Sequence, residues 1–257
     1  MYLYAKKSLG QNFLVNPHIV DKIVSAAEIS KDDIILEVGP GTGNLTKKLA
    51  EKARKVIAVE KDHRLIEPLK ETLESCPNIE IIEADILRWC PSYTSYKIVA
   101  NIPYYITSNF LRTVFEKWPA PNLIVLTIQR EVAQRIMAKP PHMNLLALSI
   151  QYYSEPEIIS YISKNNFRPV PKVDSAVIRL KHKNNKHKNK KQEEKLFNLI
   201  RVGFSEKRKQ LVNNLAKLGY SKKKIMDFTE SKGINPKTRA EELNLEQWQE
   251  LLRYLDA

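Results

Sequence analysis

Apolar and polar residues follow two alternating patterns along the chain. Short apolar runs such as Ile34–Val38 and Leu123–Ile128 are typical of buried strands, whereas Leu45–Lys52 carries leucines one helical turn apart and predicts a helix. The expected strands are 34–38, 56–60, 79–83, 98–101 and 123–128. The expected helices are 17–27, 45–52, 64–74, 107–117 and 131–138. This alternation predicts an α/β domain with a parallel sheet and helices on both of its faces.

The pattern changes in the next part of the chain. Leu145–Tyr153 is a further apolar helix candidate, and two β-rich segments follow it at Glu157–Ser163 and Val173–Lys181. The proline-rich stretch Phe167–Pro171 joins these two segments, which could pair antiparallel. The predicted sheet is therefore mixed, although most of its strands are parallel.

The composition shifts abruptly at the run Lys181–Lys191, which contains no apolar residue and therefore cannot bury a side chain in a core. We predict an exposed linker over residues 182–193, which separates a first domain at 1–181 from a second at 194–257. Helical spacing recurs at 194–204, 207–218, 222–228 and 245–255. The second domain is therefore expected to be small and all-α.

The charge balance indicates the kind of partner. The 257 residues include 42 Lys and Arg against 29 Asp and Glu, a net charge of +13, which favours a polyanion. Nucleic acid is the leading candidate, because neither a long apolar segment nor a helix with one dominant basic face indicates a membrane. The segment Met1–Lys7 lacks the apolar core of a secretory signal, so we expect a cytoplasmic protein. Two cysteines without paired spacing indicate neither a metal site nor a disulfide framework.

Polar residues end successive predicted strands. They are Glu37, Glu60, the run Glu83–Asp85, and Asn101. Right-handed crossovers bring the carboxyl ends of parallel strands to one edge of a sheet, where open α/β proteins bind their ligands. We therefore expect these side chains to surround one site.

The first strand end carries the pattern E-x-G-x-G-x-G, formed by Glu37, Gly39, Gly41 and Gly43. Nicotinamide enzymes usually show G-x-G-x-x-G around a pyrophosphate, which the Glu37 carboxylate would repel. The same carboxylate would attract the ammonium of a methionyl group. Glu60 could accept hydrogen bonds from both ribose hydroxyls, and Asp85 could accept one from an adenine amine. Together these side chains indicate S-adenosylmethionine as the ligand. A nicotinamide oxidoreductase stays open as an alternative, and NADH binding without S-adenosylmethionine binding would favour it.

The run Asn101–Tyr104 is the most specific signal. The amide oxygen of Asn101 and the constrained backbone carbonyl at Pro103 can accept both hydrogens of an exocyclic amine and direct its lone pair toward a methyl donor. Tyr104 offers an aromatic face to a flipped base, and Phe167 could cover the other face. A core aromatic is an equally good interpretation of Phe167.

These motifs resemble those of the ribosomal RNA adenine dimethyltransferases, which share a Rossmann-like class I S-adenosylmethionine methyltransferase fold. The resemblance extends to Gly10–Leu14, Phe167–Ala176 and Gly203–Leu215. It implies that each of two adjacent adenines near the 3′ end of small-subunit (16S) ribosomal RNA receives two methyl groups. It also implies cofactor contacts at Asn12, Leu14, Gly39, Glu60, Asp85 and Asn101.

Two branches of this family remain open at the catalytic motif. Ile102 stands where leucine is more frequent in the small-subunit branch, and isoleucine is common in the macrolide-resistance branch that methylates large-subunit (23S) RNA. The segments Gly203–Leu215 and Arg239–Leu243 resemble the small-subunit branch, which we favour. Pro140–Leu145 departs from the family pattern. The expected partner is small-subunit RNA within the immature 30S particle, bound by a monomer.

Basic residues of the second domain are the candidate RNA contacts. They are Arg201, Lys207, Arg208 and Lys209, near a predicted helix start. The linker lysines between 183 and 191 could add a nonspecific tether or form a solvated surface. A different class of function also fits these residues, namely a ribosome-assembly factor that depends on RNA affinity and not on turnover.

Overall fold

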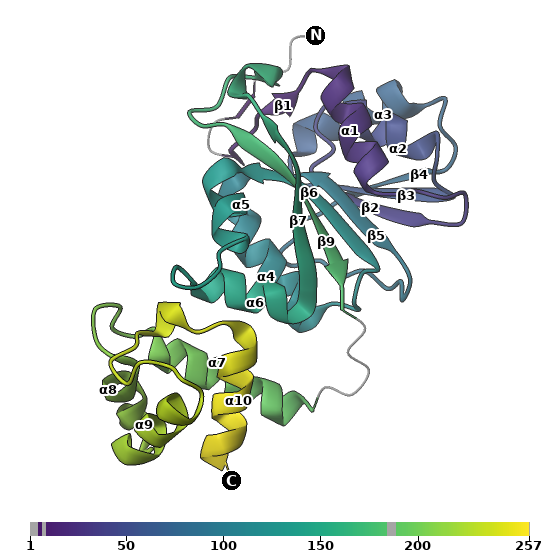
Figure 1. Ribbon diagram of the computed structural model, residues 1–257. Coiled ribbons are helices and arrows are strands. Elements are labelled where there is room, and N and C mark those ends of the chain that lie inside the picture. Colours follow the sequence, from purple (N-terminus) through teal and green to yellow (C-terminus); the bar gives the residue numbers. More distant parts are fainter. Residues whose placement is uncertain (1–4, 7–8, 184–188, 257) are drawn as a thin grey trace. The chain divides into compact units, whose positions relative to one another are not determined.

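The computed structural model describes residues 5–6, 9–183 and 189–256, and its contacts divide the chain into two compact units (Figure 1). Unit 1 comprises Met1–Ala133 and Ser154–His182, and unit 2 comprises Gln134–Tyr153 and Lys183–Ala257. This division differs from the predicted boundary at residue 181, because Gln134–Tyr153 groups with the helices of unit 2. Residues 184–188 of the predicted linker lie outside the described residues.

Unit 1 is built on a seven-stranded sheet in the order β4-β3-β2-β5-β6-β9-β7. The strands are β2 (Ile34–Val38), β3 (Lys55–Glu60), β4 (Ile79–Glu83), β5 (Lys97–Asn101), β6 (Leu123–Gln129), β7 (Ser154–Ile162) and β9 (Ser175–His182). The first five strands of the order pair in parallel, whereas β9 pairs antiparallel with both β6 and β7. The predicted mixed α/β sheet is confirmed, including the antiparallel pairing of the two β-rich segments.

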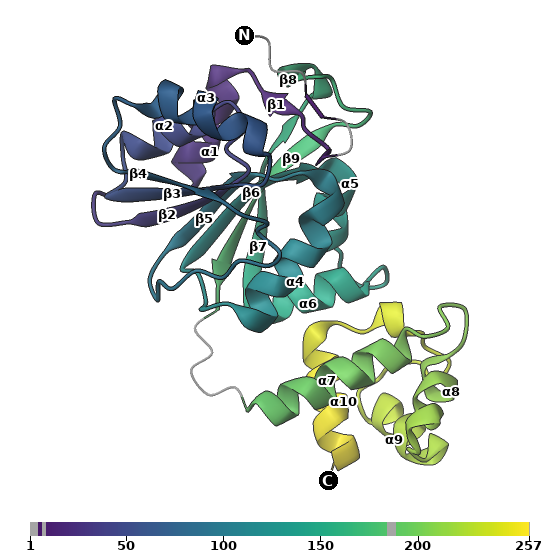
Figure 2. The ribbon, with the colours of Figure 1, turned by 180° about the vertical axis from the view of Figure 1, so that it is seen from behind.

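Helices cover both faces of this sheet. They are α1 (Pro17–Ala26), α2 (Asn44–Ala50), α3 (His63–Leu73), α4 (Thr107–Lys117) and α5 (Arg130–Ile136). Figures 1 and 2 show α1, α2 and α3 on one side of the strands and α4 and α5 on the other. Side chains fix two of the helix starts, since Asn16 accepts from the backbone N–H of His18 at the start of α1 and Asp62 accepts from that of Arg64 at the start of α3.

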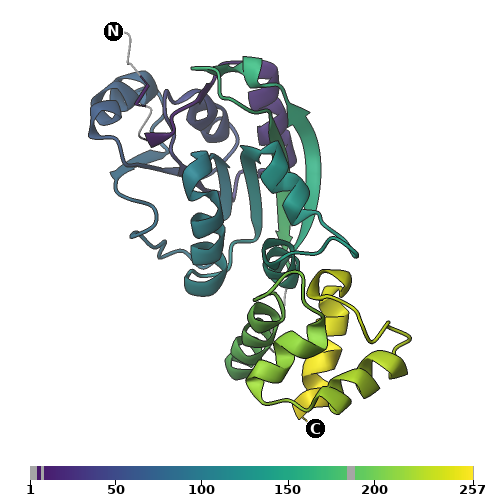
Figure 3. The same ribbon diagram turned by 90° about the vertical axis from the view of Figure 1, so that its left-hand side faces the viewer.

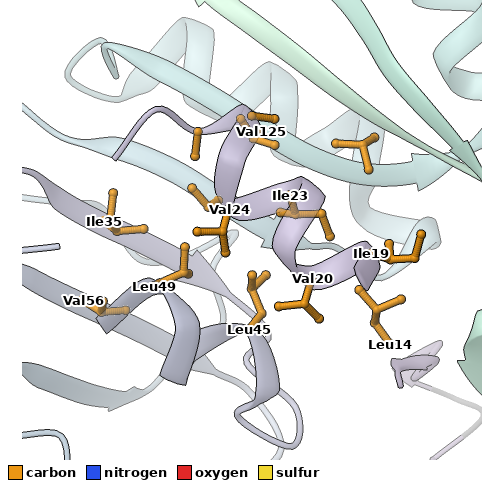
Figure 4. Close-up of a cluster of buried hydrophobic side chains, with 14 of the residues drawn as sticks. Leu14, Ile19, Val20, Ile23, Val24, Ile35, Leu45, Leu49, Val56 and Val125 are labelled. Carbon is orange, nitrogen blue, oxygen red and sulfur yellow. The ribbon is translucent and has the colours of Figure 1, made fainter. Parts of the chain in front are cut away.

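The core of unit 1 lies between α1, α2 and the sheet (Figure 4). Ile23 of α1 and Leu49 of α2 are fully buried, as are Ile35 and Val125 of the strands beneath them. Burial of each such side chain stabilises the fold by roughly 1.5–3 kcal/mol. This packing fixes the strands whose ends carry the polar residues.

Two short strands that the sequence pattern does not predict join distant segments. Strand β1 (Phe13–Leu14) pairs antiparallel with β8 (Phe167–Arg168), with Leu14 opposite Phe167. A strand of two residues has no periodicity, so only the tertiary structure reveals it. The pairing joins residues 9–14, called the N-terminal segment below, to the loop that carries Phe167.

Unit 2 is helical. Its helices are α6 (Leu145–Tyr153), α7 (Lys190–Gly203), α8 (Leu211–Leu215), α9 (Lys222–Ser231) and α10 (Leu245–Asp256). Figure 3 shows α7 and α10 side by side. They approach closely because Gly203 has no side chain: a Cβ there would overlap the ring of Trp248. No helix among the described residues is long and apolar enough to cross a membrane.

Three details of unit 2 differ from the sequence-based expectations. Helix α7 begins at Lys190, so the last part of the predicted linker is helical. Helix α8 begins at Leu211, so Lys207–Lys209 lie in the turn before it and not in a helix. Helix α6 belongs to this unit because the ring of its Tyr152 packs edge to face on that of Phe197, with centroids 5.1 Å apart.

Candidate active site

The carboxyl ends of the parallel strands meet at one edge of the sheet. Glu60 lies opposite Glu83 in the register of β3 and β4, and Asn101 lies opposite Thr127 in that of β5 and β6. Beyond this edge lies a cleft of about 850 Å³, counting the space open to solvent. Its lining comes from residues 9–13, 38–41, 59–65, 84–87 and 101–106. An open cleft at the carboxyl ends of parallel strands is where α/β proteins bind nucleotide-like ligands.

The glycine turn after β2 has two different parts. Gly39 and Gly41 adopt φ of 65° and 61° and line the cleft. A Cβ at Gly41 would lie 2.8 Å from the ring of Phe13, so only glycine fits there. Gly43 lines no described pocket. It precedes α2 with φ 82°, and its missing side chain makes room for Leu69 and Leu73 of α3.

Glu37 is a buried acid without a full set of partners. It is 2% exposed, and its Oε2 has no hydrogen-bond partner within the described part of the chain. Burial, with a contribution from the Glu60 carboxylate, raises the pKa of Glu37 to about 8. It borders a smaller pocket shared with Leu14, Gly39 and Asn101. A buried acceptor of this kind fits an ammonium group, which would pair with it and favour its charged form.

Glu60 is held in one orientation by backbone N–H groups. Its Oε1 accepts from Lys61 and Asp62 at 2.8 Å each, and its Oε2 accepts from Gly41 at 3.4 Å. Burial raises the pKa of Glu60, and the hydrogen bonds oppose this shift. The carboxylate borders the cleft with acceptor capacity remaining, which fits a pair of ribose hydroxyls.

Asp85 carries a partner that the sequence analysis did not foresee. Lys61 Nζ lies 2.8 Å from Asp85 Oδ2, while Asp85 Oδ1 accepts from the backbone N–H of Leu87 at 3.1 Å. The hydrogen bond from Lys61 lowers the pKa of Asp85, and Asp85 raises that of Lys61. The Lys61 side chain is 52% exposed, so the pair contributes only about 0.2–1 kcal/mol and opens at little cost.

Asn101 is oriented by the N-terminal segment. Its Nδ2 donates to the backbone carbonyl of Asn12 at 3.0 Å, which leaves Oδ1 as the acceptor available to a ligand. The Asn12 side chain turns back to the carbonyl of Gly10 at 3.1 Å. The Pro103 carbonyl accepts from the N–H of Ile106 at 3.1 Å, so part of its acceptor capacity closes the turn after the motif.

The two predicted aromatic platforms differ in position. Tyr104 lines the cleft, and its hydroxyl lies 2.6 Å from Oγ of the fully buried Ser175. Phe167 is fully buried and packs in the core cluster with Leu14, so it does not line the cleft in this structure. Its interpretation as a core aromatic is the one that the structure supports, because pairing of β1 with β8 holds it inward.

Tyr105 is an aromatic residue that the sequence analysis missed. It is 56% exposed, lines the cleft, and its ring would lie 3.0 Å from a Cβ at Gly10. The second tyrosine of the Pro103–Ile106 turn is the only signal in the sequence that could have indicated it. Tyr105 thus stands at the mouth of the cleft against the N-terminal segment.

The N-terminal segment lines the cleft and is held there by hydrogen bonds to other parts of the chain. Gln11 Nε2 donates to Asp62 Oδ2 at 2.8 Å, and Asp62 also holds Arg64. Hydrogen bonding to Arg64, supported by Gln11, lowers the pKa of Asp62 to about 2. The segment therefore contacts the charged Asp62 at Gln11, Asn101 at Asn12, and β8 at Phe13 and Leu14.

Three of the candidate RNA contacts of unit 2, Lys207, Arg208 and Lys209, lie in one turn before α8, whereas Arg201 lies within α7. Lys209 and Lys217 pair with Glu206 at 2.7 and 2.5 Å, and these two lysines lower the pKa of Glu206 to about 2. The buried Asn214 shapes the turn, because its Nδ2 donates to the carbonyls of Gly203 and Glu206 at 2.6 and 3.1 Å. Among the described residues, Lys207 and Arg208 form no ion pair. Arg201 Nε donates to the carbonyl of Phe197 at 3.2 Å.

Comparison with known proteins matches this geometry to one family. Residues 3–257 match the family described as ribosomal RNA adenine dimethylase. The ribosomal RNA small subunit methyltransferase A of Dehalococcoides mccartyi is 42% identical over 255 residues, covering 97% of this chain and 88% of the relative. That of Mycoplasmopsis pulmonis is 42% identical over 245 residues, covering 94% of this chain and 95% of the relative.

Solved structures agree with the sequence comparison. The 23S rRNA methyltransferase ErmE superposes with a TM-score of 0.83 at 29% identity, covering 96% of this chain and 100% of that chain. A dimethyladenosine transferase from Plasmodium falciparum superposes with a TM-score of 0.82 at 29% identity, covering 95% of this chain and 97% of the other. No cluster of metal-binding side chains occurs in the described ranges.

Proposed function

The chain belongs to the ribosomal RNA adenine dimethylase family, and we propose that it dimethylates two adjacent adenines near the 3′ end of small-subunit ribosomal RNA. Members of this family are methyltransferases that use S-adenosylmethionine. The relatives at about 42% identity are named for the small subunit, whereas the large-subunit enzyme ErmE is 29% identical. This difference supports the small-subunit branch over the macrolide-resistance branch.

The strand ends from β2 to β4 would hold the cofactor. The unpartnered Oε2 of Glu37 fits the methionyl ammonium, the fixed carboxylate of Glu60 fits the ribose, and Asp85 fits the adenine amine. Phe13 and the bare backbone at Gly41 line both pockets. When bound, S-adenosylmethionine supplies an electrophilic methyl group on a cationic sulfur.

Asn101 and the Pro103 carbonyl would position the acceptor amine. Asn101 Oδ1 and the Pro103 carbonyl would each accept one hydrogen of the amine, which withdraws the nitrogen lone pair from conjugation with the purine ring and directs it toward the methyl donor. Both oxygen dipoles also stabilise the positive charge that develops on this nitrogen as the new bond forms. The amine therefore becomes nucleophilic without a strong base, while Tyr104 holds the base against the cleft wall.

The RNA would be held in part by unit 2. The turn with Lys207 and Arg208 presents cations that no carboxylate neutralises within the described residues, which suits phosphate contacts. We propose that the enzyme acts as a cytoplasmic monomer on small-subunit RNA within the immature 30S particle. The net charge of +13 supports binding to such a polyanion.

The observation that carries this proposal is the amide of Asn101, whose Nδ2 is engaged by Asn12 so that Oδ1 is left for an amine. The test is mass-spectrometric mapping of methylated adenines after incubation with unmodified small and large subunits. We expect two adjacent dimethylated adenines in small-subunit RNA only. Methylation confined to large subunits would overturn the branch assignment, and full activity of Asn101→Ala would overturn the role of Asn101.

A second function is favoured by the separation of the basic turn from the cleft residues along the chain. The protein could act in ribosome assembly through RNA affinity alone. In that case Asn101→Ala would restore subunit maturation in cells that lack the protein, whereas charge reversal at Lys207, Arg208 and Lys209 would not. Failure of Asn101→Ala to restore maturation, with normal binding to subunits, would exclude this second function.

A further inference from the structure

We propose that Arg130 and Tyr161 form a binding site for the RNA backbone beside the target adenine. This inference rests on the proposed function and adds a contact in unit 1 to those expected in unit 2. Arg130 begins α5 immediately after β6, and Tyr161 lies near the end of β7. Both residues are therefore at the sheet edge that carries the candidate active site.

The two side chains form a cation–π pair at the surface. The guanidinium carbon of Arg130 lies 4.8 Å from the centroid of the Tyr161 ring, and Tyr161 is 51% exposed. Arg130 forms no ion pair within the part of the chain that the structure describes. Its guanidinium therefore contacts an aromatic ring and not a carboxylate. A guanidinium whose charge lies over a ring has N–H groups available for two parallel hydrogen bonds to a phosphate.

Neighbouring contacts place this pair next to the acceptor side of the cleft. The backbone N–H of Arg130 donates to the carbonyl of Asp174 at 3.0 Å, and the next residue, Ser175, holds the hydroxyl of Tyr104. Tyr161 lies opposite Ala176 in the register of β7 and β9. The strands that fix Tyr104 therefore also fix Arg130 and Tyr161, with no flexible segment between them.

The charges around the pair favour a polyanion. Arg168 and Lys172 lie on the loop that leads to Asp174. The carboxylate of Asp174 accepts from the backbone N–H of Lys164 at 3.0 Å, so part of its acceptor capacity is used. Glu131 is the other acid that adjoins Arg130 in the chain. The cations outnumber these two acids once Lys164 is included, and an exposed ring beside a guanidinium suits a nucleotide better than an acidic peptide.

The test compares Arg130→Ala with the matched control Arg54→Ala. Arg54 is an exposed arginine just before β3, at the opposite edge of the same sheet. Methyl transfer is measured against the concentration of unmodified small subunits and of salt, and binding of S-adenosylhomocysteine and thermal melting are measured in parallel. These two readouts verify that each variant is folded and that its cofactor pocket is intact.

For Arg130→Ala we expect KM for the subunit to rise about tenfold with kcat nearly unchanged, because one charge-assisted phosphate contact is lost. The slope of log affinity against log salt should fall by about one. Tyr161→Leu should raise KM by about threefold, since it removes the ring that orients the guanidinium, and Arg130→Lys should fall between wild type and Arg130→Ala. Arg54→Ala should match wild type.

An unchanged KM and salt slope in a folded Arg130→Ala protein would overturn this inference while leaving the proposed function intact. The same holds if Arg54→Ala raises KM equally, because the effect would then come from net charge alone. If wild type itself fails to methylate small subunits, the proposed function fails instead. In that case the affinities of wild type and of Arg130→Ala for small subunits are measured directly. Equal affinities would reject the inference.

Discussion

The two halves of the cleft are built in different ways. In the cofactor half, at the ends of β2 to β4, the central carboxylate Glu60 is fixed by its own turn, because it accepts from the next two backbone N–H groups. The acceptor half joins residues far apart in the chain, since Asn101 bonds to Asn12 across 89 positions and Tyr104 to Ser175 across 71. Local geometry therefore defines the first half, and tertiary packing defines the second.

This difference teaches where a substitution should be felt. Substitutions in the cofactor half should mainly alter binding of one ligand, because Glu60 is held by its own turn and the pair of Lys61 and Asp85 is exposed. Changes in the acceptor half should disturb folding and turnover together. Four predictions test this contrast, in order of decreasing expected effect.

The largest effect is expected for Phe167→Ala. The ring is fully buried in the core cluster, so its loss should lower the free energy of unfolding by about 3–5 kcal/mol. Urea denaturation measures this, with Tyr105→Ala as the control because that ring is 56% exposed and should cost under about 1 kcal/mol. If Phe167→Ala keeps full stability and loses only methyl transfer, Phe167 is a base platform and the contrast weakens.

Asn101→Ala comes next. Loss of the amide oxygen should reduce the rate of methyl transfer by about 10²–10³-fold, the usual effect of removing one preorganised polar group from the reacting centre. Affinity for S-adenosylhomocysteine, measured by calorimetry, should change little. Asn12→Ala is the matched control, because Asn101 bonds to the backbone of Asn12 and not to its side chain. A loss in Asn12→Ala as large as that in Asn101→Ala, with the affinity for S-adenosylhomocysteine unchanged, would contradict the assigned geometry.

Glu37 gives the cofactor half a pH dependence in the absence of ligand. Its pKa is raised by burial to about 8 from an ordinary 4.5, so between these values the folded protein keeps a proton that the unfolded chain has lost. Stability from this group is complete below pH 4.5 and is lost as the pH rises through 8. Between pH 6 and 9 the free energy of unfolding should fall by on the order of 3 kcal/mol.

Glu37→Gln is the variant that isolates this effect, because the amide has similar size and does not titrate. Urea denaturation at both pH values should show a smaller decrease for the variant than for wild type. Equal decreases in the two proteins would mean that Glu37 titrates normally. The cofactor half would then lack the buried neutral acid described above.

Lys61→Met should produce the smallest effect. Without Lys61, Asp85 need not leave an ion pair to accept from the cofactor adenine, so S-adenosylhomocysteine should bind about threefold more tightly and with less dependence on salt. Lys48→Met, which breaks an exposed pair with Glu51, is the control. Weaker binding of Lys61→Met would show that Lys61 itself contacts the ligand.

The sequence predicts the cofactor half better than the acceptor half for the same physical reason. Apolar runs identify β2, β3 and β5, and the residues that end them are the ones that border the cleft. The pairing of Lys61 with Asp85 depends on two strand ends lying side by side, so no local pattern reveals it. The burial of Phe167 likewise follows from β1, which is too short to have a pattern.

Unit 2 shows a similar division between local and tertiary signals. The spacing of apolar residues predicts the helices of unit 2 after residue 190. It also predicts helix from residue 207, where the chain instead forms a turn held by hydrogen bonds from the Asn214 side chain. The membership of α6 depends on ring contacts between Tyr152 and Phe197, which spacing cannot show. Periodicity indicates that a segment is helical, whereas only packing shows which neighbours it joins.

The N-terminal segment over the cleft has a consequence for the order of events at the enzyme. Its backbone holds Asn101 at Asn12, its Gln11 is anchored to Asp62, and its strand β1 pairs with β8. The same segment of the chain therefore contributes to the binding of both substrates. We expect their affinities to be reciprocally linked: whatever factor the methyl donor adds to RNA affinity, RNA must add to donor affinity. If the donor raises the affinity for RNA, a bound target adenine raises the affinity for the donor by the same factor.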